Sequence, residues 1–319
     1  MDNKTKNILK YVFWTAVAVV MVWFCIKAID WKEFIGALTV CKWEYVALAF
    51  VVGMVFIAVR GIRWHMLIKP IDPGITTAAV INAYGIGFVA NLVLPRAGEL
   101  VKIGYVVKHS KHSWDAIIGT YLAEKGIDAA ILLCTVGAFV VGTWGRESLD
   151  FGRSGSMLGI TLAFFGAAIL FSVLCYFLRA KGGIWGKCWG FISGIGKGLS
   201  SSRHMERPWL FILYTALIWV SFWFTSACIV WALADIEPFT RLNMADAFYC
   251  TVAGCVSTLI PVPGGFGAYH GAVATVLQVL NGIPMGSGMI YATLNHETQM
   301  LAQIVVGLCG YARESFGSK

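Results

Sequence analysis

The sequence predicts an all-α polytopic membrane protein with about six full spans and two opposed re-entrant hairpins that form an inverted repeat. The first observation is composition: of 319 residues, 58% are hydrophobic and 13% are charged, and the mean hydropathy is +0.72. This balance excludes a soluble globular domain. The second is that apolar segments near the ~20 residues that cross a bilayer recur along the chain. The third is that two apolar segments are broken by proline and glycine at corresponding places.

Several segments are long and apolar enough to be full spans. They are residues 9–29, 43–67, 115–141, 157–178, 208–234 and 285–311. Residues 30–42 and 185–202 mix apolar and charged side chains and are expected to lie at the membrane surface. No hydrophilic region is long enough to form a soluble domain, so residues 1–319 are predicted to be a single membrane domain.

The distribution of Lys and Arg predicts the orientation. These residues are concentrated at the amino terminus, after the second span and over residues 179–207, whereas residues 146–153 and 235–246 balance or outnumber them with acids. By the positive-inside rule, both termini are expected in the cytoplasm and the chain in the cell inner membrane. Loop lysines and arginines facing anionic lipids also explain the net charge of +8. Membrane lipids are therefore the expected partners, and nucleic acid is rejected.

Two further apolar segments fit hairpins that enter the membrane and return to the same side. Residues 76–111 begin and end on the cytoplasmic side, and residues 244–280 begin and end on the outer side. Proline removes a backbone donor and glycine permits positive φ, so continuous helix is expected to break at such residues. In lipid such a break is tolerated only inside protein or beside water. The predicted breaks are Asn91, Pro95 and Gly98 in the first hairpin, and Pro261, Pro263 and Gly267 in the second.

The two hairpins also match each other in sequence. One constant offset relates three positions of the first hairpin to three of the second, namely Asn91, Pro95 and Gly98 to Ser257, Pro261 and Gly264. Each hairpin follows two predicted spans and precedes one that carries charge near its middle. With opposite orientations, this order predicts an inverted-topology repeat of residues 1–150 and 151–319, with the substrate site near the midplane between the halves.

Charged residues at membrane depth are costly and therefore mark candidate sites. Glu124 and Asp128 are four residues apart on one predicted helix, so both face one side, where Arg96 or Lys102 could reach them. Such pairing leaves a cationic group open for an anionic headgroup, and the alternative is a salt-bridge network that only fastens hairpin to helix. The residues predicted to bind a lipid headgroup are Arg96, Glu99, Lys102, Glu124, Lys125, Asp128, Gly264, Gly265 and His270.

The second half offers polar groups of a different kind. Gly264 and Gly265 could present backbone N–H groups to a phosphate, although glycines also suit a plain tight turn. His270 could contact a headgroup or be a buried histidine with one hydrogen bond. His296 and Glu297 are candidates for proton coupling, and Glu297 is expected to find its partner in His296 or in the other half.

The remaining polar residues carry no predicted chemistry. Arg60 and Arg63 are expected to extend from a cytoplasmic helix end to lipid phosphates. The nine cysteines show neither a CxxC pair nor zinc-ligand spacing, so they are interpreted as small core residues. The sequence lacks Asp-x-Asp, GxSxG, HExxH and P-loop motifs, so no metal and no cofactor is expected.

Three segments together resemble a known family. Residues 91–99 (NLVLPRAGE), 124–128 (EKGID) and 261–267 (PVPGGFG) are similar to the lysylphosphatidylglycerol synthase transmembrane-region family, also described as flippase-like, and the similarity extends over nearly the whole chain. The resemblance implies a bundle that moves or flips a lipid. In some members that bundle is fused to a soluble domain that attaches an amino acid to phosphatidylglycerol. That domain is absent from this sequence, so aminoacyl transfer is not expected.

The sequence departs from the family pattern at three places. The usual acid–arginine pair is Glu124-Lys125, which keeps the charges but loses the two-pronged guanidinium. His270 stands where an acid is usual after the proline–glycine turn, and His296 stands where an arginine is usual in the last span. These departures leave the identity of the lipid and any ion coupling open.

The leading hypothesis is a lipid translocase that moves an anionic phospholipid or a polyprenyl-phosphate lipid between leaflets by alternating access. Arg96, Lys125 and the Gly264-Gly265 turn are expected to hold the headgroup. One alternative is a membrane-embedded lipid-modifying transferase with Glu124 or Asp128 as its base. Another is a non-transporting assembly partner of cell-envelope biosynthesis enzymes.

Overall fold

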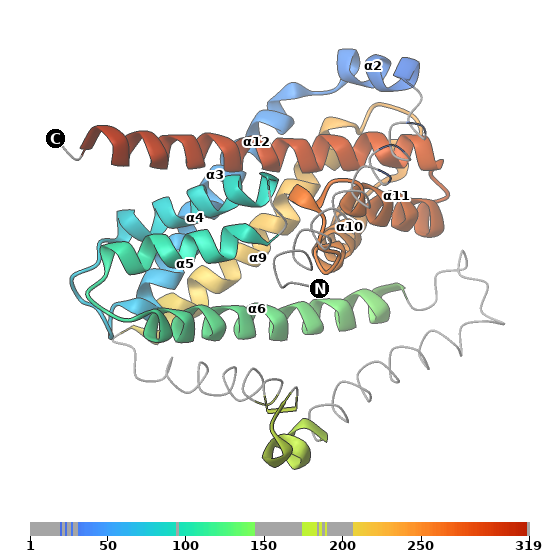
Figure 1. Ribbon diagram of the computed structural model, residues 1–319. Coiled ribbons are helices and arrows are strands. Elements are labelled where there is room, and N and C mark those ends of the chain that lie inside the picture. Colours follow the sequence, from blue (N-terminus) through green and yellow to red (C-terminus); the bar gives the residue numbers. More distant parts are fainter. Residues whose placement is uncertain are drawn as a thin grey trace.

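The computed structural model describes residues 31–93, 96–143, 174–183 and 207–317, together with positions 20, 23, 27, 185, 186 and 189. Over residues 31–143 and 207–317 the described chain forms a bundle of helices, whereas the described residues among 174–189 lie apart from it, and the described residues contain no strand (Figure 1). The predicted all-α membrane protein is confirmed to that extent. The predicted spans over 9–29 and 157–178 fall almost entirely outside the described residues, and so does most of the predicted surface segment 185–202.

Three of the described helices are long and apolar enough to cross a membrane: α3 (Trp43–Ile68), α6 (Trp114–Thr143) and α9 (Pro208–Ala232). At 1.5 Å per residue, the 26 residues of α3 span about 39 Å, more than the hydrocarbon core of a bilayer. The fourth long helix, α12 (Met285–Gly317), covers the last predicted span but carries polar residues near its middle. Residues 30–42, expected at the membrane surface, contain the short helix α2 (Trp31–Val40).

The first predicted hairpin consists of α4 (Thr77–Val93) and α5 (Ala97–His109), which lie side by side (Figure 1). The helix is interrupted as predicted, and Arg96 precedes α5 in the left-handed conformation with φ of 61°. Pro95, the predicted cause of the break, lies outside the described residues. Gly98 packs directly against the backbone of Gly87, and its N–H donates to Asn91 Oδ1 over 2.8 Å. A close helix crossing therefore holds the hairpin together.

The second hairpin consists of α10 (Met244–Ser257), the short turn η4 (Pro263–Gly265) and α11 (Ala268–Asn281). The break predicted at Pro261, Pro263 and Gly267 is present, because no α-helix continues between Ser257 and Ala268. Gly264, Gly265 and Gly267 all adopt positive φ, between 59° and 80°, which a side chain would strain.

The turns of the two hairpins meet. The Arg96 guanidinium donates to the Leu259 carbonyl over 3.2 Å, and Leu92 lies against Gly264. Helix α12 packs along both hairpins: Gly307 crosses Gly85 of α4, and Gly288 crosses Ala274 of α11. The first hairpin thus lies toward the carboxyl-terminal end of α12 and the second toward its amino-terminal end (Figure 1).

Each hairpin has its own buried apolar cluster. Ile103 and Val106 of α5 pack with residues of α3, α4, α6 and α9, whereas Val273 and Leu277 of α11 pack with residues of α2, α3, α9, α10 and α12. Helices α3 and α9 take part in both clusters, so they form the shared wall of the bundle. Close van der Waals packing between helices, with small residues at the crossings, is how membrane bundles associate.

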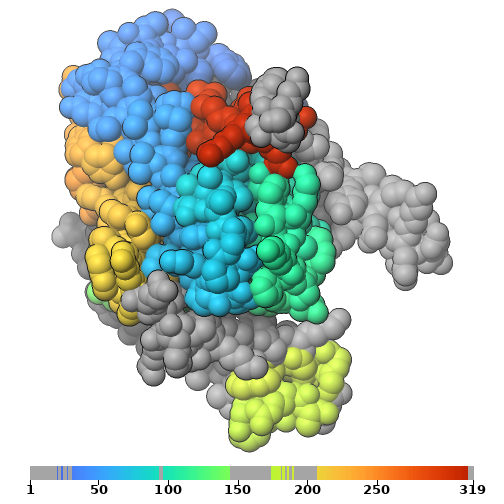
Figure 2. Space-filling view, turned by 90° about the vertical axis from the view of Figure 1, so that its left-hand side faces the viewer, coloured from blue at the N-terminus to red at the C-terminus, as the bar shows by residue number. Residues whose placement is uncertain are grey.

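One end of the bundle brings α4, α5 and α12 together. Figure 2 shows α4 and α5 side by side with the carboxyl-terminal part of α12 above them. A groove of about 290 Å³ lies among their ends. Lys108 Nζ pairs with Oε1 of Glu314, one of the lining residues, at 2.9 Å. The residues that line the groove are Thr76, Ala78, Ala79, Asn82, Tyr105, His109, Arg313 and Glu314.

At the same end, Asp72 joins the loop after α3 to the loop after α5. Its carboxylate accepts hydrogen bonds from Ser110 Oγ at 2.7 Å, from the Lys111 N–H at 3.1 Å and from the Gly74 N–H at 3.0 Å. These bonds, with the Ser110 hydroxyl first among them, favour the ionised form and hold the pKa of Asp72 below its ordinary value. The Asp72 carboxylate therefore stabilises the contact between these two loops only while it is charged.

We expect low pH to destabilise the wild-type protein more than it destabilises the Asp72→Asn variant. A folded-state pKa below the unfolded value means that the carboxylate stabilises the fold above the unfolded pKa of about 3.9, and that this contribution is lost as pH falls through the folded value. The measurement is the melting temperature of detergent-solubilised protein between about pH 6 and about pH 3. Asp115→Asn, an exposed acid in the first turn of α6, is the control. Equal acid sensitivity in wild type and Asp72→Asn would contradict the prediction.

Candidate functional site

A network of charged side chains joins α3 to α6 inside the bundle. Arg63 Nη2 donates to Glu124 Oε1 over 3.0 Å and to Asp128 Oδ1 over 2.7 Å. Arg60, one turn earlier on α3, donates to the other Asp128 oxygen. The side chains of Arg63 and Glu124 are fully buried. The expectation that Arg60 and Arg63 extend to lipid phosphates is therefore wrong, because both arginines are used to neutralise acids within the protein.

The first hairpin adds its own charges to this network. Lys102 Nζ of α5 lies 4.0 Å from Glu124 Oε2 and 3.3 Å from Glu99 Oε2, so the predicted approach of Lys102 to the α6 acids is present. Lys125 Nζ lies 3.2 Å from Glu99 Oε1. Arg96 does not reach the acids: it is exposed and donates to the Leu259 carbonyl at the hairpin turns.

Aromatic rings enclose the buried lysine. Lys102 Nζ lies 4.0 Å from the ring centroid of Tyr84, 4.9 Å from that of Tyr121 and 5.0 Å from that of Trp64. Ring faces attract a cation, most strongly where water is excluded. The Tyr84 hydroxyl also donates to Glu124 Oε1. These aromatic residues cannot be singled out from the sequence, because nothing local distinguishes them from the many other aromatics of the chain.

The network holds more positive than negative charge. Its members are four cations and three acids, Arg60, Arg63, Lys102 and Lys125 against Glu99, Glu124 and Asp128, which leaves a formal surplus of one positive charge. Among the described residues, Arg60 Nε, Arg63 Nε and Arg63 Nη1 have no hydrogen-bond partner. The side chains of Glu99 and Lys125 are each 30% exposed, so the network is open at that edge. An anion that reaches this edge meets uncompensated positive charge.

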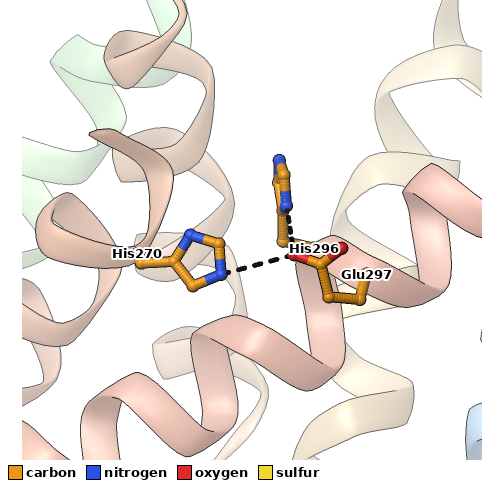
Figure 3. A group of neighbouring side chains, drawn as sticks. All are labelled: His270, His296 and Glu297. Atoms are coloured by element: carbon orange, nitrogen blue, oxygen red, sulfur yellow. Dashed lines mark hydrogen bonds and ion pairs between the residues drawn. The ribbon is translucent and has the colours of Figure 1, made fainter. Parts of the chain in front are cut away.

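A second polar cluster lies between α11 and α12 (Figure 3). Glu297 Oε1 is 3.0 Å from His296 Nδ1 and 3.5 Å from His270 Nε2. The expected pairing of Glu297 with His296 is therefore present, and His270 joins them. His296 Nε2 lies 3.1 Å from the Gly264 carbonyl oxygen, which ties the cluster to the turn of the second hairpin.

The glycine turn itself uses some of its donors locally. The Gly265 N–H donates to the Val262 carbonyl over 3.2 Å, and the Phe266 N–H donates to the Pro263 carbonyl over 3.2 Å. These bonds are those of a tight turn, so at Gly265 the geometry favours the turn interpretation over a cradle for phosphate. The group that the turn directs into the neighbouring cluster is the carbonyl of Gly264.

Comparison with known proteins places the chain in a family. The model of the lysylphosphatidylglycerol synthase transmembrane region matches residues 11–307. The chain belongs to this family. The match covers α2 to α11, most of α12 and both polar clusters, and it supports a membrane protein with a role related to lipids. Searches of curated proteins and of solved structures give no match.

Proposed function

We propose that this family member is a lipid translocase, moving an anionic phospholipid or a polyprenyl-phosphate lipid between leaflets by alternating access. The observation that carries the proposal is the surplus positive charge of the α3–α5–α6 network at an edge open to its surroundings. A phosphate-bearing headgroup at that edge would complete the neutralisation.

The electrostatic cost of the network supports a functional role. An ionisable residue at the centre of a membrane helix costs about 2.5–3.5 kcal/mol on insertion scales, so chains rarely keep such residues without a use. A purely structural role accounts for the pairs that Arg60 and Arg63 make with the α6 acids. A structural role does not account for Lys125, because its partner Glu99 also forms an ion pair with Lys102. Lys125 is therefore the residue that we assign to the headgroup first, with Arg96 near the hairpin turns as the second contact.

The arrangement of the hairpins supports movement between leaflets. In the proposed topology, each hairpin enters from one side and their turns meet inside the membrane, where Arg96 bonds to Leu259 across the junction. Residues 1–150 and 151–319 would be the two inverted repeats that rock about this point.

The orientation of the bundle follows from the basic residues at one of its ends. Helices α3, α5 and α12 all finish at this end, which carries Lys69, Lys108 and Arg313. By the positive-inside rule, these residues support a cytoplasmic assignment for that end and for the carboxyl terminus.

The proposal is tested by lipid movement in liposomes. Purified protein is reconstituted with fluorescent phosphatidylglycerol or phosphatidylcholine, and the fraction of label exposed outside is followed with a membrane-impermeant quencher. We expect movement of the anionic lipid to exceed that of the zwitterionic lipid. Lys125→Gln and Arg96→Ala should each slow the anionic lipid about tenfold, the effect of losing one charged contact of ~1.4 kcal/mol.

Lys111→Gln is the matched control, because it removes the same charge from an exposed loop away from the network. Equal slowing by Lys111→Gln and Lys125→Gln would show a general effect of charge and would contradict the proposed site. No movement of any lipid by folded protein, with and without a proton gradient, would overturn the translocase. A new lipid product in the same liposomes would favour a transferase instead.

A further inference from the structure

The cluster of His270, His296 and Glu297 between α11 and α12 contains the ligand types of a metal site. The three side chains offer two imidazole nitrogens and a carboxylate oxygen, and these atoms all lie within 4.8 Å of one another (Figure 3). Both histidines are buried, with 6% and 7% of their surface exposed. Sequence spacing gave no sign of the group, because His270 comes from a different helix.

The hydrogen bonds of His296 leave a place for a cation. The Gly264 carbonyl oxygen can only accept a hydrogen bond, so His296 Nε2, 3.1 Å away, carries the proton. In the neutral ring, Nδ1 then carries a lone pair and no proton. It lies 3.0 Å from Glu297 Oε1. Two acceptors at this distance repel each other unless a positive species lies beside both. Donation of the one ring N–H to a backbone carbonyl is also a usual way in which a metal-bound histidine is oriented.

The separations match those between ligands of one ion. Nitrogen and oxygen ligands at 2.0–2.2 Å from a tetrahedral Zn²⁺ are about 3.4 Å apart. The two contacts of Glu297 Oε1, at 3.0 Å and 3.5 Å, bracket this value. The two ring nitrogens, up to 4.8 Å apart, must approach each other by about 1.4 Å to complete the set. Within the described part of the chain, His270 Nδ1 makes no hydrogen bond that would oppose this movement.

The cluster is flanked by aromatic rings on one side and is accessible on another. The ring of His296 is flanked by Tyr269 and Phe266, with centroids at 4.8 Å and 5.3 Å. The Glu297 side chain is 42% exposed, which leaves one side of the cluster accessible. Two imidazoles and one carboxylate are a ligand set for a divalent transition metal, and three protein ligands leave a coordination position open.

We infer that His270, His296 and Glu297 bind one divalent transition-metal ion of the Zn²⁺ type, which fastens the turn of the second hairpin to α12. The ion neutralises the acid and joins α11 to α12 beside the Gly264 carbonyl. An anionic oxygen or a water molecule reaching the cluster from the accessible side of Glu297 would complete the coordination. This inference does not depend on lipid transport.

The first test is metal content and affinity. Untagged protein in detergent is stripped with a chelator, exposed to Zn²⁺ in competition with a chromophoric chelator, and analysed by mass spectrometry for bound metal. We expect one Zn²⁺ per chain, with affinity lowered at least tenfold by Glu297→Gln and abolished in His270→Ala/His296→Ala. His112→Gln, which removes an exposed loop histidine, should bind as the wild type does.

The second test needs no variant and reads the ligands directly. Co²⁺ bound in place of Zn²⁺ should give visible d–d bands of a four- or five-coordinate nitrogen–oxygen site, and X-ray absorption of the zinc form should show two imidazoles. Thiolate charge-transfer bands would place the metal at cysteines and overturn the inference. Zinc binding no stronger in wild type than in the double histidine variant would also overturn it, and would leave a shared proton between His296 and Glu297.

Discussion

Replacing Glu124 by glutamine is expected to lower the free energy of unfolding by about 3–5 kcal/mol. The carboxylate is fully buried, and it accepts a hydrogen bond from Arg63 at 3.0 Å with Lys102 at 4.0 Å. Glutamine keeps the shape but removes the charge, so two buried cations lose a counter-charge and the surplus of the network rises. An unpaired buried charge costs more than the pair itself contributes, which makes this the largest electrostatic effect that we expect in the chain.

The measurement is unfolding in mixed detergent micelles with rising SDS content, followed by tryptophan fluorescence. Glu237→Gln, at an exposed loop position, makes the same chemical change without burial and should shift stability by less than about 0.5 kcal/mol. Adding Lys102→Met to Glu124→Gln removes one of the orphaned cations and should restore about 1 kcal/mol or more, as coupled neighbours do. If Glu124→Gln unfolds like Glu237→Gln, the ion pairs do not hold hairpin to helix.

The sequence indicates the acids of this network, but it does not indicate the arginines of α3 that pair with them. Glu124 and Asp128 could be placed on one face because the helical period is local. The arginines opposite them lie more than 60 residues earlier, and α3 is apolar around most of its circumference, so hydropathy gives its depth but not the face that it turns inward. The sequence therefore predicts Arg60 and Arg63 at the lipid surface, whereas in the structure both pair with acids inside the bundle.

The breaks of the two hairpins were predictable for a different reason. Proline and glycine act on the backbone where they stand, so the end of α10 and the start of α11 follow from the residues between them. The cluster at His270, His296 and Glu297 depends on how α11 packs against α12, which local rules do not give. Of this cluster, only the contact between His296 and Glu297 could be predicted from the sequence, because these residues are adjacent in the chain.

Replacing Gly98 by alanine is expected to destabilise the first hairpin by about 3 kcal/mol. A Cβ atom at this position would lie 1.9 Å from the Gly87 carbonyl oxygen and 2.6 Å from Asn91 Cγ. Backbone cannot move aside as a side chain can, so α5 must shift away from α4. The measurement is again unfolding in mixed micelles, combined with the rate at which a cysteine placed at Val101 reacts with a water-soluble maleimide.

Gly119→Ala is the matched control, because a Cβ there meets nothing within 4 Å on the exposed face of α6. The same substitution should be neutral or stabilising by up to about 1 kcal/mol, since alanine favours helix. Lys102 follows Gly98 by one turn on α5, so a shift of this helix also draws Lys102 away from Glu124. If both alanine variants behave alike, α4 and α5 do not cross at Gly98, and the close approach that carries Lys102 into the charged network is absent.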